Sequence, residues 1–398
     1  DSSNENDADT DTDTDTDSDT DTDSDTDTDT GADEEYSVCA DGTGAFTTIQ
    51  AALDNAAEGD IISVCPGIYA EQINVPRALT LVGVGTSRDD VVIDAGGNGT
   101  VVEVLASGAV SLEALTLTGG DAGAVYSRGA DLLLENVHVT GNVGENIGEI
   151  DGGTITLTDV LWDENVASNA SVLLVEDADL YAVRLDVRSN SSTGSADGWF
   201  HFLLLGSGNS ELANLIMARN GRGTQIYTEQ ESLFVRNAVL DMDENTTGIS
   251  GGAYFDSAAS ATITVQNAVL MAQGYSTGLS WALGTSSTVE YSNLVDLAYT
   301  LCEGSCITTV PGSTNMASDP KFNDAASGDY TLDSFSPCVD AGNPAAAYND
   351  PDLTRNDIGA YGGPDAIPEA PPSPPVELTR SAHRASSSGA ISVSRQFK

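Results

Sequence analysis

A short alternation of apolar and polar positions recurs along residues 102–296. Each copy reads as an apolar strand, a small or polar corner residue, a second apolar strand, and then Gly or Asn. Two clear copies are LEALTLTGG from Leu112 and LENVHVTGN from Leu134. The corners recur every 22 to 30 residues, with Arg184 filling the slot of a skipped copy; the others are Ala114, Asn136, Asp159, Asn214, Asn237, Asn267 and Asn293. A period of this length predicts a solenoid.

Strand-rich copies without a helical period predict a parallel β-helix, in which each turn of the coil pairs with its neighbours. Inward positions then stack like on like, which suits Val, Leu, Ile and Ala. Recurrent Asn at one corner predicts a ladder of side-chain amides that satisfy buried polar groups at the bend. The members of this expected ladder are Asn136, Asn214, Asn237, Asn267 and Asn293. The alternative is a β-sandwich of short strands, but sandwiches do not repeat corner residues.

The strongly negative charge of the chain limits the kinds of molecule that it is expected to bind. The 398 residues carry a formal net charge of −48, and 40% are apolar but only 6% aromatic. Residues 36–375 alone hold 44 acidic and 10 basic residues. Such a body should repel nucleic acid and anionic lipid, and should suit divalent cations, high salt or a cationic partner. Plain solubility in a salty environment explains the charge equally well. There is no run of 18 apolar residues, so no segment is expected to span a membrane.

The first 35 residues are of low complexity, and Asp9–Thr30 alternates Asp with Thr or Ser. Without apolar side chains to bury, this stretch is expected to be an extended or disordered tether, whose hydroxyls could carry glycans. The start at Asp1 without Met suggests a processed form. Such tethers are typical of bacterial surface lipoproteins, so a membrane anchor preceding this chain is inferred. Alternating Thr could also add as a strand to a neighbouring subunit.

The stretch from Asp41 reads DGTGAFTTIQAALDNAAEGDIISVCPGIYAEQINVPRALTLVGVG. It resembles the N-terminal start of the pectin lyase-like superfamily, as in pectin methylesterases. The resemblance implies an all-β, right-handed parallel β-helix from about Tyr36 to Cys306, with a capping helix over Phe46–Ala57 that covers the first coil. Strands are expected at Ile61–Cys65 and Leu79–Val82.

A second stretch, Tyr330–Gly363, resembles the closing segment of many secreted β-helix repeat proteins. It reads YTLDSFSPCVDAGNP followed by DPDLTRNDIGAYGG. Four acids gather there, namely Asp340, Asp350, Asp352 and Asp357, and they could bind Ca²⁺. Their spacing is not that of an EF-hand, and the alternative is that they cap turns through backbone hydrogen bonds.

The five Cys residues suggest an oxidising compartment. Cys39 and Cys65 end two strands expected to be neighbours, so they are expected to form a disulfide. Either Cys302 or Cys306 could pair with the other or with Cys338, which leaves one thiol over. The three His residues are scattered and do not support a zinc site.

Members of the resembled superfamily include lyases, esterases and glycosidases that act on acidic polysaccharides. A methylesterase of this type needs paired Asp and an Arg in recognisable motifs, which the sequence lacks; GEIDGG at 148–153 is only superficially similar. Weak catalytic candidates remain at Arg219, Arg236 and Asp241, with Arg184, Arg188, Arg222 and Asp243 nearby. Arg on an outer strand face more often pairs with Asp or Glu, and an acidic body makes a poor cleft for a polyanion.

Two classes of function stay open. The first is an extracellular structural or adhesive β-helix without catalytic activity, which could self-assemble into a fibre through its tails or bind a cell-surface glycan. The second is a polysaccharide-active enzyme, for which the densest aromatic run is Trp199–Phe202. The expected segments are a tether (1–35), a cap with the first turns (36–95), the repeats (96–306), a closing segment (307–364) and a Pro-rich linker with a basic tail (365–398).

Overall fold

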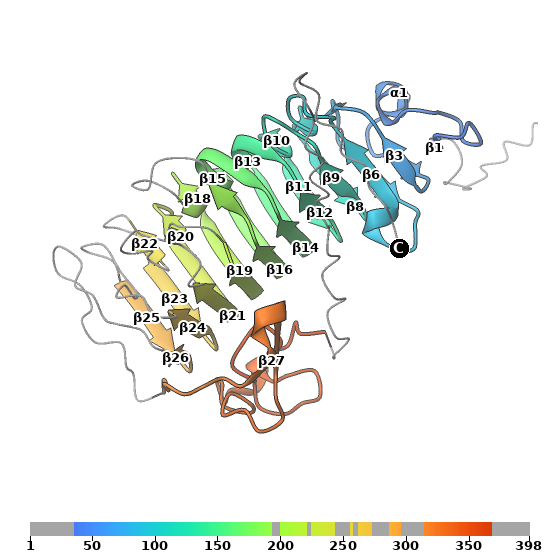
Figure 1. The fold of residues 1–398 in the computed structure, drawn as a ribbon. Coiled ribbons are helices and arrows are strands. Elements are labelled where there is room, and N and C mark those ends of the chain that lie inside the picture. The colour runs from blue at the N-terminus through green and yellow to red at the C-terminus, as the bar shows by residue number, and fades with distance from the viewer. Residues whose placement is uncertain are drawn as a thin grey trace, which may run out of the picture. The chain divides into compact units, whose positions relative to one another are not determined.

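The computed structural model describes residues 36–192, 200–220, 224–242, 255–257, 262–272, 286–295 and 314–367. Within these, the chain winds into a right-handed parallel β-helix whose strands stack turn upon turn (Figure 1). The sequence-based prediction of the fold class is therefore confirmed. The helix expected over Phe46–Ala57 is the shorter α1 (Ile49–Asn55), which buries Ile49, Ala52 and Leu53 against the first coil. No helix in the described part is long and apolar enough to cross a membrane.

One long sheet, here called sheet A, contains two short strands or one longer strand from each turn. Its members pair in parallel with the next turn. They are β1 (Ser37–Val38), β2 (Ile61–Val64), β3 (Gly67–Tyr69), β5 (Thr80–Gly83), β6 (Val91–Asp94), β8 (Ala109–Glu113), β9 (Thr116–Thr118), β11 (Asp131–Glu135), β12 (His138–Thr140), β14 (Thr154–Asp163), β16 (Asp179–Arg188), β19 (Asn209–Ala218), β21 (Ser232–Met242), β23 (Thr262–Gln266), β24 (Val269–Ala272), β25 (Ser286–Glu290) and β26 (Asn293–Val295).

The second sheet, sheet B, closes each turn of the coil. Its parallel strands are β4 (Ile73–Val75), β7 (Val102–Val104), β10 (Val125–Arg128), β13 (Val143–Asp151), β15 (Val166–Glu176), β17 (Ser191–Ser192), β18 (Phe200–Leu205), β20 (Thr224–Thr228) and β22 (Phe255–Ser257). The 3-10 turn η1 (Arg88–Asp90) joins β5 to β6 within the coil. Outside the coil lie the antiparallel pair β27 (Phe322–Asp324) and β28 (Asp329–Leu332) and the 3-10 turns η2 (Ala325–Ser327) and η3 (Ala346–Tyr348).

The repeat read from the sequence is the register of sheet A. One inward column consists of the apolar positions that open the repeat copies, and consecutive members pair directly: Leu112, Leu134, Leu157, Ala182, Leu212, Val235, Val265 and Val289. All but Val289 are at most 2% exposed. Because a slip of one residue would turn each of these side chains to solvent, the column fixes the register.

The first corner of each turn divides sheet A into two halves. Its residue has a left-handed backbone, with φ between 50° and 56°, in every turn from Ala114 to Tyr291. The members are Ala114, Asn136, Asp159, Arg184, Asn214, Asn237, Asn267 and Tyr291. Left-handed φ costs L-residues energy, least for Asn and Asp, whose short side chains tolerate it. Asn therefore recurs at this corner because it tolerates the left-handed backbone, and not because its side chains form an amide ladder there.

One expected corner residue was wrong. Asn293 pairs with Val269, two positions past the corner at Asn267, and Tyr291 is the left-handed residue of that turn. The backbone N–H of Asn267 donates to Glu290 O, which places Tyr291 next in register. The sequence reading aligned this copy on its Asn, whereas the apolar column, which ends in Val289, sets the true register.

A buried Asn ladder does exist, but at the second corner, where sheet A turns toward sheet B. It comprises Asn142, Asn165, Asn190 and Asn220, and each is at most 6% exposed. Each Oδ1 from Asn165 onward accepts both the backbone N–H and the Nδ2 of the Asn one turn before, at 3.0–3.2 Å. Each Nδ2 also donates to a backbone carbonyl of the preceding turn. The ladder satisfies polar groups that the bend buries.

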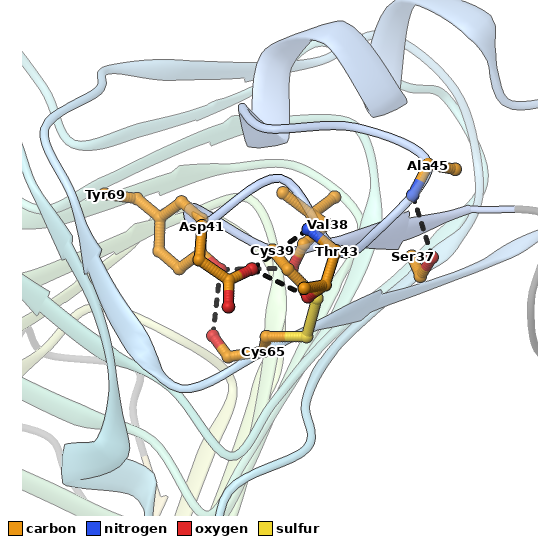
Figure 2. The surroundings of a disulfide bond; sticks show 8 residues. All are labelled: Ser37, Val38, Cys39, Asp41, Thr43, Ala45, Cys65 and Tyr69. Carbon is orange, nitrogen blue, oxygen red and sulfur yellow. Dashed lines mark hydrogen bonds between the residues drawn. A yellow bond between two sulfur atoms is a disulfide. The ribbon is translucent and has the colours of Figure 1, made fainter.

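The N-terminal turns are tied by the disulfide between Cys39 and Cys65, the pair expected from the sequence (Figure 2). The hydroxyl of Tyr69 donates to Val38 O at 3.0 Å and to Cys65 O at 2.9 Å, so it bridges the same two strands. Beside the disulfide lies an open cavity of about 820 Å³ whose lining includes Ile61, Val82 and Val84 and no charged residue. It therefore presents no titratable group for catalysis.

Candidate functional site

Residues 314–367 are the described part of the chain that covers the expected closing segment (307–364), and from here on the name closing segment means these residues. They lie against the outer face of the second half of sheet A. A separate apolar cluster forms there: Ile216, Val239 and Val269 point outward from three successive turns and pack against the closing segment. Its own contributions include Tyr330, Cys338, Ile358 and Ala360. Removing this apolar surface from water is the non-directional part of the attachment.

The corner Asn side chains supply the directional part. Asn214 Nδ2 donates to both Ala360 O and Gly362 O at 2.8 Å. One turn on, Asn237 Nδ2 donates to Asn356 Oδ1 at 2.9 Å. In the following turn Asn267 Oδ1 accepts from the backbone N–H of Asn343 at 2.7 Å.

Asn293, although displaced from the corner, has the same role. Its Nδ2 donates to Ser318 O at 2.8 Å and its Oδ1 accepts from Ser318 N at 2.9 Å. Three of the expected ladder members, together with Asn293, therefore bind the closing segment. The fifth, Asn136, is exposed.

The weak catalytic candidates contact the same segment. Arg236 donates from Nε to Glu211 Oε1 at 3.0 Å and from Nη1 to Asp365 Oδ2 at 2.6 Å. Arg219 donates from Nη2 to Ala325 O at 2.8 Å and also to Ala326 O. Arg219 therefore holds a backbone turn of the closing segment and Arg236 holds the carboxylate of Asp365, and neither contact requires a substrate.

Asp241 also faces the closing segment. Its Oδ2 accepts from the hydroxyl of Tyr330 at 2.9 Å, in a contact that is buried from solvent. Burial, and then the negative charge of Asp241, raise the pKa of Tyr330, so the phenol keeps its proton and remains a donor. Arg222 and Asp243 lie outside the described residues.

Three of the four Asp residues expected to bind calcium accept backbone N–H groups in this structure, as turn caps do. Asp350 accepts the backbone N–H groups of Asp357 and Gly363, Asp357 accepts that of Asp340, and Asp352 accepts that of Thr354. Burial, followed by repulsion from Asp350 and Asp340, raises the pKa of Asp357 to about 6. In the part of the chain that the structure describes, no group of three or more His, Cys, Asp or Glu is arranged to hold a metal ion.

The outer face nearer the N-terminus is polar beside the closing segment, whose Gly328 lies close to the Arg188 guanidinium group. Here, side chains from η1, β12, β14 and β16 form what we call the polar row: Asp89, His138, Asp163, Asp186 and Arg188. Strand pairing places His138 beside Leu161 and Asp163 beside Arg188 on successive turns. Among these five side chains, the sequence pattern marked only Arg188 as a neighbour of the catalytic candidates.

His138 is the centre of the polar row. Its Nδ1 lies 2.9 Å from Asp89 Oδ1 and its Nε2 lies 2.9 Å from Asp163 Oδ1, and its side chain is 17% exposed. Burial alone would lower the pKa of His138, but the hydrogen bonds to Asp163 and Asp89 outweigh it and raise the pKa to about 9. At neutral pH the ring is therefore a cation that clamps two carboxylates, and it cannot accept a proton as a general base.

The second half of the polar row is an ion pair. Arg188 Nε donates to Asp186 Oδ1 at 2.7 Å, and its Nη2 contacts the other carboxylate oxygen. Asp163 and Asp186 come from adjacent strands and are two residues out of register. Strand spacing and rise put such positions roughly 8 Å apart. Two carboxylates placed in this way on an outer face have potential for acid–base chemistry.

The aromatic run noted in the sequence belongs in part to the core. Phe202 on β18 is fully buried, and His201 beside it is buried as well. Trp199 lies outside the described residues, as do Cys302 and Cys306. Cys338 is a buried free thiol, and burial raises its pKa.

No protein-family model matches the chain, and a search of curated proteins finds no match. Among solved structures, a pectate lyase, Pel9A, is similar at 10% identity over 79% of this chain and 90% of that one, with a TM-score of 0.45. A pectin methylesterase from Aspergillus niger matches at 16% identity over 63% and 84%, with a TM-score of 0.36.

A pectin methylesterase from carrot is similar at 14% identity over 64% of this chain and 88% of that one, with a TM-score of 0.33. The strand pairing of the chain itself is that of a parallel β-helix. At these identities the likeness concerns the fold alone, and the activities named are those of the other proteins.

Proposed function

We propose that this chain is a structural or adhesive β-helix that works outside the cell without catalysing a reaction. The observation that supports this most is the use of Arg219, Arg236 and Asp241. All three side chains bond the chain's own closing segment, and so serve the fold. The β-helix then acts as a stiff acidic body to which the closing segment is firmly bound.

The disulfide between Cys39 and Cys65 supports an extracellular place, because such bonds persist in oxidising compartments. The net charge of −48 argues against nucleic acid and anionic lipid as partners. The partners we propose are a second copy of the chain or a cell-surface glycan, with attachment to a membrane only through an anchor that precedes this chain.

A direct test combines an activity assay with a binding assay. The purified protein is incubated with pectin, polygalacturonate and alginate, with and without calcium, and the reaction is followed by release of unsaturated ends and of methanol. We expect no product, and we expect R219A and R236A to lower thermal stability while glycan binding or self-association persists. Turnover of any of these glycans that R219A or R236A abolishes would refute the structural proposal.

The second candidate is a polysaccharide-active enzyme that uses the polar row. It is favoured by the placement of Asp163 and Asp186 on adjacent strands of the outer face, where their side chains are 20% and 21% exposed. Strand spacing and rise place the two backbone positions roughly 8 Å apart, which would allow their carboxyl groups to flank a glycosidic bond and a water, as in an inverting glycosidase. In that case D163N and D186N would each abolish glycan cleavage, whereas R236A, on β21 beside the closing segment, would leave it unchanged at a temperature where the variant is folded.

A further inference from the structure

The loop that joins β6 to β7 contains Asn98-Gly99-Thr100, an Asn-x-Thr sequence. Such sequences are acceptors for N-linked glycans when they lie on exposed loops of secreted proteins. Three more Asn-x-Ser/Thr sequences begin at Asn169, Asn190 and Asn245. The side chains of Asn169 and Asn245 lie outside the described part, so the structure can compare Asn98 with Asn190.

Asn98 is presented to solvent on a fixed base. Gly96 and Gly97 have φ of 65° and 80°, a left-handed backbone that carries the chain out of the coil, and Asn98 follows them as an exposed residue. The base of the loop is held because the N–H groups of Asp121 and Ala122 both donate to Gly99 O at 3.0 Å. The Asn98 Nδ2 donates to Ala95 O at 3.1 Å and Gly96 O at 3.4 Å, two long bonds within its own loop.

Asn190 has the opposite surroundings although it begins a similar sequence, Asn190-Ser191-Ser192. It is 1% exposed and belongs to the buried ladder. Its Nδ2 donates to Trp162 O at 2.8 Å, Arg188 O at 3.1 Å and Asn220 Oδ1 at 3.1 Å. A sugar on this nitrogen would break the ladder, so Asn190 is a built-in negative control for Asn98.

We propose that Asn98 is the attachment site of an N-linked glycan, an inference that rests on the proposed extracellular location. The co-reactant is a phosphate-activated sugar. A bond forms between Asn98 Nδ2 and the anomeric carbon, the bond from that carbon to the phosphate oxygen breaks, and Nδ2 loses one proton to the transferase. Thr100, two residues on, completes the sequence that the transferase recognises.

The acceptor test uses the full chain in its folded state, a soluble Asn-glucosyltransferase and UDP-glucose, with peptide mapping by mass spectrometry. We expect one hexose at Asn98 of the folded protein, none at Asn190, and none at this loop in N98Q or T100A. A digest treated in the same way should gain hexose at both sequences. Modification of Asn190 in the folded protein, or an Asn98 that reacts only in the digest, would overturn the inference.

The second measurement maps the Asn98 peptide of the protein isolated from its own cells, alongside fractionation of those cells. We expect a glycan on Asn98 and the protein in the extracellular or surface fraction. An unmodified Asn98 in an extracellular protein would overturn the glycan proposal alone. An unmodified Asn98 in an intracellular protein would overturn both the glycan proposal and the proposed location.

Discussion

The carboxylate of Asp365 lies 2.6 Å from Nη1 of Arg236, a residue 129 positions earlier in the chain. The same Asp365 accepts a hydrogen bond at its backbone oxygen from Arg184 Nη1 at 3.1 Å. One residue near the end of the closing segment is therefore held by guanidinium groups from two turns of the coil. These contacts, with the corner Asn side chains, make the closing segment part of the fold.

Breaking this contact should loosen the closing segment. We expect R236A to lower the free energy of unfolding by about 1–3 kcal/mol, because the half-buried Glu211 and Asp365 lose a charged donor. Chemical denaturation at neutral pH measures this. The matched control is R128A, whose salt bridge with Asp151 has an Arg side chain that is 68% exposed and should cost less than about 1 kcal/mol. Equal losses for the two variants would contradict the assignment.

The buried ladder should be the most sensitive polar feature of the coil. Replacing Asn165 by Leu removes the acceptor of Asn142 and the donor to Asn190, both buried, so we expect a loss of about 3 kcal/mol or more. Its control is N136G at the exposed first corner, where φ is 52° and Gly carries no Cβ penalty. N136G should stay within about 0.5 kcal/mol of the parent chain. A mild N165L would mean that the ladder is not buried in solution.

The clamp at His138 predicts a loss of stability at alkaline pH. Its pKa in the folded protein, about 9, lies above the ordinary value of 6.5. The stabilisation is therefore complete below about pH 6.5 and is lost as the pH rises through 9. The difference in unfolding free energy between the parent chain and H138Q should shrink from pH 6 to pH 10. A difference that stays constant over this range would show that His138 is not charged.

Asp357 should also make stability fall as the pH rises, but over the acidic range. Its folded pKa of about 6 is raised above 3.8, so its contribution is fully present below pH 3.8 and is lost as the pH rises through 6. We expect D357N to be more stable than the parent at pH 7 and no more stable at pH 4, since the amide oxygen can still accept from Asp340 N. Identical stability at pH 7 would contradict the buried, repelled carboxylate.

Calcium at the same carboxylates remains a separate proposal. A bound Ca²⁺ would relieve the repulsion among Asp340, Asp350, Asp352 and Asp357, and would add about 2.7 kcal/mol of stability at a free concentration one hundred times the Kd. The melting temperature of the parent chain should then fall on adding EDTA, and that of D357N should not change. An unchanged melting temperature of the parent chain would leave these residues as turn caps alone.

The features of the fold that repeat from turn to turn could be predicted from the sequence. The column from Leu112 to Val265 could be predicted because burial forces like residues into equivalent positions. The sequence also contains the true ladder, as the Asn that closes each of four copies: Asn142, Asn165, Asn190 and Asn220. The more frequent Asn at the first corner, however, led to the prediction of a ladder there. There, Asn meets the left-handed backbone, a local preference that looks the same in sequence as a stacked amide.

Contacts without a period could not be predicted. Asn214 and Ala360 are 146 residues apart, and neither segment contains a sequence pattern that indicates contact with the other. The same holds for His138, whose partner Asp89 stands on a 3-10 turn outside the repeat. The sequence therefore showed Arg219 and Arg236 only as charged residues on outer strand faces, and their bonds to the closing segment became evident from the structure.

Hydrogen–deuterium exchange over residues 330–363 tests the central claim most directly, because it reports whether the closing segment is docked. In the parent chain we expect slow exchange at amides such as Gly359, which donates to Asn267 O, and Ile358, which donates to Cys338 O. In the triple variant N214A, N237A and N267A, exchange over 330–363 should become faster while β8, β11 and β14 keep their protection. A closing segment that exchanges freely in the parent chain, or protection that the triple variant leaves intact, would contradict the account.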